Sequence, residues 1–188
     1  MNESTEHAPE EDLHGPDPGA VPEAGFFGRI IDKGGVIFAL MIVAAMFMLI
    51  WEVFARYVLN SPTAWVHETV VFLCGLAFIY GGLYAVARDS HIRVVLIYDV
   101  IPKGARRVLD IVISLVCAFT SVMFGWAAWG MATKATFAPS GEMRFETSGS
   151  AWNPPYPAYV KIFLCAAMVA LTIQFLILAF NYLRGGQR

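Results

Sequence analysis

The stretch Ile162-Phe-Leu-Cys-Ala-Ala-Met-Val-Ala-Leu-Thr-Ile-Gln-Phe-Leu-Ile-Leu-Ala-Phe-Asn-Tyr-Leu183 decides the fold class of this protein. It contains 22 residues without a charge, and Lys161 and Arg184 bracket it. A helix needs about 20 mostly apolar residues to cross the hydrocarbon core of a bilayer. Strands of a membrane barrel alternate in polarity, and this stretch does not. The sequence therefore predicts a transmembrane helix here.

Three further charge-free stretches precede this one, at residues 34–51, 69–87 and 111–133. The whole chain is 57% hydrophobic and 15% charged, whereas soluble domains are about 45–50% apolar and about 25% charged. We therefore expect an all-α integral membrane protein with four transmembrane helices. The expected membrane domain covers residues 29–184, with spans at about 34–56, 68–88, 110–133 and 161–183.

The segments outside the spans are short. Residues 1–28 hold seven acidic residues, four prolines and no Lys or Arg, a composition typical of a disordered acidic tail rather than a signal peptide. Residues 185–188 form a short C-terminal tail. Between the second and third spans, His91–Tyr98 is apolar except for Arg93 and too short to cross, so we expect it to lie along the cytoplasmic membrane interface.

The distribution of Lys and Arg predicts the orientation. Nine of these residues flank the termini and the loop after the second span, and four lie in the loops on the opposite side. Cytoplasmic flanks carry the excess of positive charge in membrane proteins, and acidic residues contribute little to this rule. Both termini are therefore expected in the cytoplasm.

The sequence contains little that indicates chemistry. A net charge of −2 gives no sign of a nucleic-acid partner. The three cysteines all lie in apolar stretches, where free thiols usually act as small hydrophobic groups. We find no nucleotide-binding loop, metal-ligand cluster or catalytic triad, so we expect no enzyme activity, no catalytic residue and no bound metal or cofactor.

A small group of charges marks the first hairpin. Glu52 and Arg56 are spaced i, i+4 at the end of the first span, a spacing that puts both on one face of a helix. Glu68 opens the second helix across a short loop. The three could form an ionic cluster that serves packing or subunit contact, a solvated interfacial group, or a proton or ion relay.

Other residues are candidates for structural or subunit-interface roles. Small residues recur every fourth position in the second span, a pattern that lets another helix approach closely. Aromatic residues near the span ends suit interfacial anchoring, and His91 could cap or anchor the end of the second helix. The candidates are Ala77, Gly81, Ala85, Tyr57, Trp65 and His91.

Three segments together resemble a known family. The run Glu52-Val-Phe-Ala-Arg56-Tyr57-Val-Leu-Asn-Ser-Pro62-Thr-Ala-Trp65-Val-His-Glu68 resembles the first hairpin of the small permease subunits of TRAP transporters, the DctQ type. His91-Ile92-Arg93-Val94 is similar to the cytoplasmic segment of that family. Trp152-Asn-Pro-Pro-Tyr-Pro157 is similar to the stretch before its last helix. The resemblance covers about residues 30–183.

This resemblance implies a scaffold subunit of a sodium-coupled secondary transporter for organic acid uptake, in the bacterial inner membrane. The implied partners are a DctM-type large permease subunit, against which the chain packs, a DctP-type periplasmic solute-binding protein and the lipid bilayer. Two alternatives remain open at the level of sequence. One is a stand-alone four-helix proton-coupled carrier or exporter that uses Glu52, and the other is a membrane anchor subunit of a redox enzyme.

Overall fold

A computed structural model describes residues 19–88 and 103–184 of the chain. A short 3₁₀ helix, η1 (Pro22–Ala24), leads directly into the first long helix. The described residues contain four long helices: α1 (Gly25–Tyr57), α2 (Ala64–Ala87), α4 (Lys103–Thr136) and α5 (Tyr156–Arg184). All four are long and apolar enough to cross a membrane, which confirms the predicted all-α class and its four spans.

The helices extend well beyond the apolar stretches that predicted them. At about 1.5 Å per residue, the 33 residues of α1 and the 34 of α4 each reach about 50 Å. The hydrocarbon core is only about 30 Å thick. The ends of α1 and α4 therefore extend to the headgroup region or beyond it, and α4 begins at Lys103, ahead of the predicted span of about residues 110–133.

The N-terminal boundary of the membrane domain differs from the expectation of a tail up to residue 28. Residues 22–28 are helical, and the segment is attached to two other helices. The backbone N–H of Val21 donates to the carbonyl of Ala87 at 3.1 Å, and Asn181 Nδ2 donates to the carbonyl of Glu23 at 2.7 Å. These bonds order a stretch whose composition alone suggested disorder. Residues 1–18, the His91–Tyr98 segment and residues 185–188 lie outside the described part of the chain.

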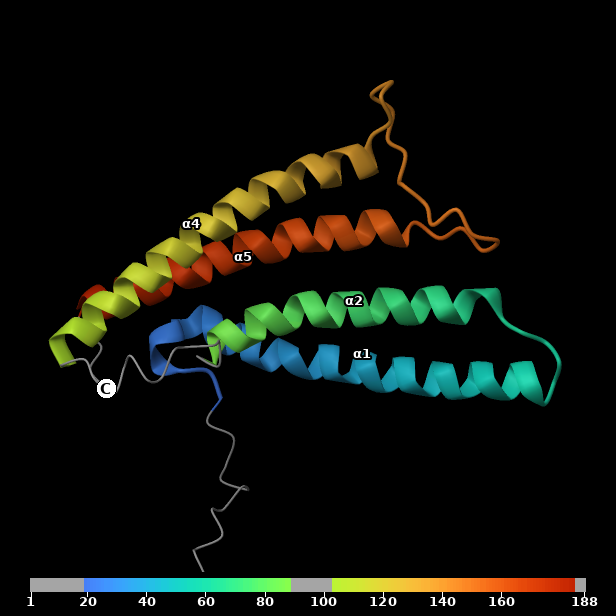
Figure 1. The fold of residues 1–188 in the computed structure, drawn as a ribbon, viewed down its shortest axis with the longest axis horizontal. Helices are drawn as coiled ribbons and strands as arrows, with labels where there is room; N and C mark the ends of the chain where they lie inside the picture. Colours follow the sequence, from blue (N-terminus) through green and yellow to red (C-terminus); the bar gives the residue numbers. More distant parts are fainter. Residues whose placement is uncertain (1–18, 89–102, 185–188) are drawn as a thin grey trace, which may run out of the picture.

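The four helices form two hairpins that lie side by side in one row (Figure 1). Along the row the helices follow the order α4, α5, α2, α1. α5 packs against both α4 and α2, and α1 packs mainly against α2. Both loops, α1–α2 and α4–α5, lie at one end of the row, which we call the loop end (Figure 1). The opposite end, where α1 begins and α5 ends, is called the terminal end.

Small residues bring α4 and α5 together. The buried positions of α4 are mostly alanines, and a Cβ added at Gly125 would lie 3.6 Å from the Cβ of Met168 on α5. Ser121, one turn away, is also buried and donates its hydroxyl to the carbonyl of Cys117 at 2.8 Å. Small side chains allow close approach of two helix backbones in a membrane, and the small residues of α4 leave room for large side chains of α5, as where Ala118 packs with Phe175 and Leu178.

Glycines of α1 fit the tyrosines of α2 in the other hairpin. A Cβ at Gly34 would lie 2.1 Å from the Tyr80 hydroxyl, and one at Gly35 would lie 2.6 Å from the Tyr84 ring. Tyr80 also donates its hydroxyl to the carbonyl of Ile31 at 2.6 Å and stacks on Phe38 with ring centroids 3.9 Å apart. The two glycines therefore set how closely α1 and α2 pack.

Polar contacts close the terminal end. Arg88 donates to Asp32 at 2.6 Å, which joins the end of α2 to α1. Arg107 of α4 donates to the last carbonyls of α5, with Nε 2.7 Å from the oxygen of Tyr182 and Nη2 2.5 Å from that of Leu183. A cation at a helix C-terminus satisfies free carbonyls and favours the helix dipole.

Candidate functional site

The predicted charge cluster at the first hairpin is present in part. Glu52 is almost completely buried, and its Oε1 accepts a bond from Arg56 at 2.5 Å. Its Oε2 accepts the backbone N–H of Thr63 at 3.1 Å and also the Thr63 hydroxyl. Each carboxylate oxygen is thus engaged, and the carboxylate closes the loop between α1 and α2.

Glu68 does not join this cluster, so the expected three-residue arrangement is wrong. Its Oε2 accepts the hydroxyl of Ser148, from the α4–α5 loop, at 2.8 Å. Among the described residues, no hydrogen bond or ion pair connects Glu68 to Glu52 or Arg56. The reason is helical geometry, because Glu68 lies one turn inside α2 and lines the groove between α2 and α5.

Glu68 instead belongs to a group of side chains that connects the two hairpins. Tyr156, the first residue of α5, stacks on Phe72 of α2 with ring centroids 4.3 Å apart, and its hydroxyl is 3.4 Å from Thr69 Oγ1. We call Glu68, Thr69, Phe72, Ser148 and Tyr156 the inter-hairpin group. The sequence does not predict this role for Ser148 and Tyr156, because nothing in their local pattern indicates which helix they contact.

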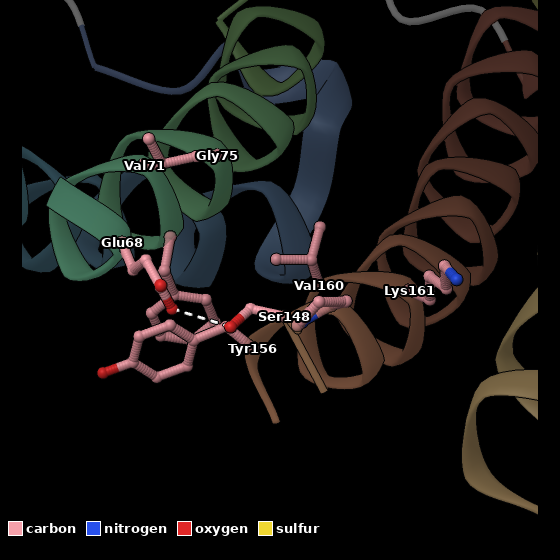
Figure 2. A pocket seen from close by; sticks show the side chains of 9 residues that line it. Glu68, Val71, Gly75, Ser148, Tyr156, Val160 and Lys161 are labelled. Atoms are coloured by element: carbon pink, nitrogen blue, oxygen red, sulfur yellow. Dashed lines mark hydrogen bonds between the residues drawn. The ribbon is translucent and has the colours of Figure 1, made fainter. Parts of the chain in front are cut away.

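A groove runs beside the inter-hairpin group, between α2 and α5. It has a volume of about 370 Å³, and its walls include Val71 and Gly75 from α2 and Val160 from α5. Figure 2 shows the hydrogen bond between Glu68 and Ser148, with Val71 and Gly75 further along α2. The lining is apolar except for the side chains of Glu68, Ser148 and Lys161 and the hydroxyl of Tyr156.

A second groove lies between α1 and α2. Its volume is about 330 Å³, and both Ala77 and Gly81 contribute to its lining. Among the described residues, a Cβ at Gly81 would meet no atom within 4 Å. Gly81 is therefore not a point of close contact between α1 and α2, whereas Gly34 and Gly35 of α1 lie directly against tyrosines of α2.

The remaining candidates lie at the helix ends. Tyr57, at the end of α1, is 79% exposed, and Trp65, in the first turn of α2, is 41% exposed. Ala85 is half-buried near the end of α2. Exposed aromatic rings at span ends are typical of interfacial anchoring. His91 lies outside the described residues.

Comparison with known proteins agrees with these features. Residues 45–185 match the family model "Tripartite ATP-independent periplasmic transporters, DctQ component". The chain is also 31% identical, over 88 residues, to the sialic acid TRAP transporter small permease protein SiaQ of Vibrio cholerae. That alignment covers 46% of this chain and 50% of SiaQ, so the chain matches about half of the length of this relative.

The family match covers α2, α4 and α5 completely and the last part of α1, from Ala45 on, including Glu52 and Arg56. It thus contains both hairpin loops and most of the membrane domain. The expectation drawn from the three sequence segments is confirmed: the chain belongs to the DctQ family, the small permease subunits of tripartite ATP-independent periplasmic (TRAP) transporters.

Proposed function

We propose that this chain is the scaffold subunit of a sodium-coupled TRAP transporter for an organic acid, and that it packs against a DctM-type large permease. A DctP-type periplasmic binding protein would deliver the substrate. The family membership supports the transporter role. The name of the relative SiaQ refers to sialic acid, which is itself an organic acid, and this supports the class of substrate.

The observation that carries the scaffold proposal is the single row of helices. A closed four-helix bundle would bury one face of each helix in a common core, but here large apolar side chains remain exposed along the membrane-spanning helices. Trp126 of α4 is 81% exposed and Phe47 of α1 is 62% exposed. Such faces suit contact with lipid and with a partner membrane protein.

The charged residues support a structural role over a transport role for this chain. The carboxylate of Glu52 is held by Arg56 and Thr63 at the loop end, away from the middle of the membrane. Functional charges of carriers typically lie within the membrane and face a water-filled path. In the fourth span the most polar side chain, Gln174, is fully buried and donates to the carbonyl of Ala24 at 3.4 Å, so it contributes to packing.

We further propose that the protein resides in the bacterial inner membrane with both termini in the cytoplasm. Nine of its Lys and Arg residues lie on the side of the termini and four on the other, which favours this orientation. The loop end would then face the periplasm, where a solute-binding protein is available.

Reconstitution tests the proposal. The chain, a DctM-type permease from the same genome, and both together would be placed in proteoliposomes with the binding protein and a labelled organic acid. Uptake is expected only when both membrane subunits are present, and only with an inward sodium gradient. Uptake by this chain alone would contradict the proposal, as would uptake that persists when potassium replaces sodium.

A further inference from the structure

The groove between α2 and α5 is apolar along the helices and polar at one end, which we call its mouth. On α2 it runs from Glu68 to Gly75, seven residues that correspond to about 10 Å along a helix. Its volume of about 370 Å³ is within the range of about 300–1,000 Å³ typical of small-molecule sites. A Cβ added at Gly75 would meet no atom of residues 19–88 or 103–184 within 4 Å, so in this part of the chain the groove is open at its inner part.

The polar mouth lies at the loop end of the helices. Glu68 is in the second turn of α2, and Tyr156 and Lys161 are in the first two turns of α5. Trp152, beside this mouth, packs edge-on against Tyr156 with ring centroids 5.6 Å apart. Aromatic rings of this kind mark the headgroup level of a membrane. A ligand of this groove would therefore have its polar part at the headgroups and its apolar part along the helices, which is the arrangement of a phospholipid.

Two charged side chains line the mouth, those of Glu68 and Lys161. The ammonium of Lys161 forms an ion pair with Glu146, and Figure 2 shows it pointing away from Glu68. Glu68 accepts one hydrogen bond at Oε2, and among the described residues its Oε1 accepts none. The ammonium that lines the mouth is thus already paired, whereas the carboxylate of Glu68 keeps an oxygen that can accept a hydrogen bond from a cation. Anionic lipids, in contrast, favour basic pockets.

We propose that this groove binds one phospholipid with a primary ammonium headgroup, of the phosphatidylethanolamine type. One acyl chain lies along Val71, Gly75 and Val160, and the ammonium donates to the carboxylate of Glu68. The lipid fills the space beside the inter-hairpin group and so joins the α1–α2 hairpin to the α4–α5 hairpin.

Native mass spectrometry of the purified full chain, titrated with phosphatidylethanolamine or phosphatidylglycerol, tests this proposal. The variant G75L places a side chain in the groove, and G82L is its matched control on the same helix, since a Cβ at Gly82 also meets no atom within 4 Å and Gly82 does not line the groove. The variant E68Q removes the charge at the mouth. Its control is E142Q, which alters an exposed carboxylate of the α4–α5 loop.

The wild-type chain and both controls are expected to retain one phosphatidylethanolamine molecule in preference to phosphatidylglycerol. G75L should reduce this binding at least tenfold, and E68Q should weaken it about tenfold, as expected for loss of one charge-assisted hydrogen bond. Melting curves and gel filtration would verify that each variant is folded. Equal binding of phosphatidylethanolamine by wild type, G75L and G82L would show that the lipid binds nonspecifically, and this would overturn the proposal. A preference for phosphatidylglycerol would also overturn it.

A second measurement tests whether a protein segment fills the groove instead. In the complex with the large permease, a cysteine at Val160 is expected to react with a lipid-soluble maleimide only after the lipid is removed by detergent. A disulfide or cross-link from that cysteine to the large subunit would assign the groove to a partner helix and overturn the lipid proposal. The titration uses this chain alone, so its failure would leave the proposed transporter role untouched.

Discussion

Glu52 and Thr63 are joined across the α1–α2 loop, with the carboxylate Oε2 of Glu52 3.1 Å from the backbone nitrogen of Thr63. The same oxygen accepts the Thr63 hydroxyl, and Oε1 accepts Arg56. Thr63 is the residue immediately before α2. This carboxylate therefore fixes the start of the second helix relative to the end of the first.

A structural role for Glu52 predicts a specific pattern of effects. The substitution Glu52→Ala should lower the melting temperature of the purified chain by several degrees, because it removes the acceptor of the partly buried Thr63 donors at the loop. Glu52→Gln, which retains one acceptor oxygen, should cause a smaller decrease. Heating followed by gel filtration measures both, with Glu142→Gln as an exposed control.

The same variants separate the scaffold role from a proton relay. In the assembled transporter, Glu52→Gln should leave the uptake rate per complex close to that of the wild type. Complete loss of uptake with normal assembly would instead favour a stand-alone or coupled function of this carboxylate.

The fit of Gly34 to Tyr80 predicts a steric coupling. Gly34→Ala places a Cβ 2.1 Å from the Tyr80 hydroxyl, so we expect a loss of about 1–3 kcal/mol in the free energy of unfolding, as for other overpacked contacts. Tyr80→Phe alone should cost about 1 kcal/mol through loss of the bond to Ile31. Because Phe lacks the clashing oxygen, the double variant should be less destabilised than the sum of the two single variants.

The free energies of unfolding of the wild type, the two single variants and the double variant, measured in mixed micelles, give this coupling. Gly81→Ala is the matched control, because a Cβ at Gly81 meets no atom within 4 Å, and it should be neutral or slightly stabilising. Strict additivity of Gly34→Ala and Tyr80→Phe would show that the tyrosine hydroxyl is not the limiting contact.

Arg107 is predicted to hold the end of α5. Arg107→Ala removes the bonds to the carbonyls of Tyr182 and Leu183, and it should cost about 1 kcal/mol or less, since exposed interactions at a helix C-terminus are screened by solvent. The effect should be local. Hydrogen exchange followed by mass spectrometry should show faster exchange in peptides from the last turns of α5, with no change in the first turns of that helix.

The orientation of the chain gives a further prediction. After the native cysteines are replaced, a cysteine at Asn60 or at Ser140, in the two loops at the loop end, should react with a membrane-impermeant maleimide added to cells with a permeable outer membrane. A cysteine at Asn2 should react only after the inner membrane is disrupted. The reverse pattern would place the termini in the periplasm and contradict the positive-inside assignment.

Much of the fold follows from local properties of the sequence. The charge-free stretches gave four spans, because the length of an apolar segment alone decides whether it can cross a bilayer. The i, i+4 spacing of Glu52 and Arg56 likewise predicted their ion pair. The helix ends were predicted less accurately, since α1 and α4 continue past the apolar stretches. The acidic composition up to residue 28 predicted a disordered tail where α1 begins.

The sequence by itself therefore determined the membrane class, the number of spans and the family of this protein. Only the tertiary structure decided the order of helices in the row, the partner of Glu68 and the fit of Gly34 and Gly35 to two tyrosines. The physical reason is that these helices are apolar on almost every side and lipid tails are equally apolar. The sequence pattern therefore does not show which apolar face of a helix packs against another helix. Which faces meet depends on the shapes of side chains from distant parts of the chain, and Ser148 meets Glu68 only after both hairpins have packed.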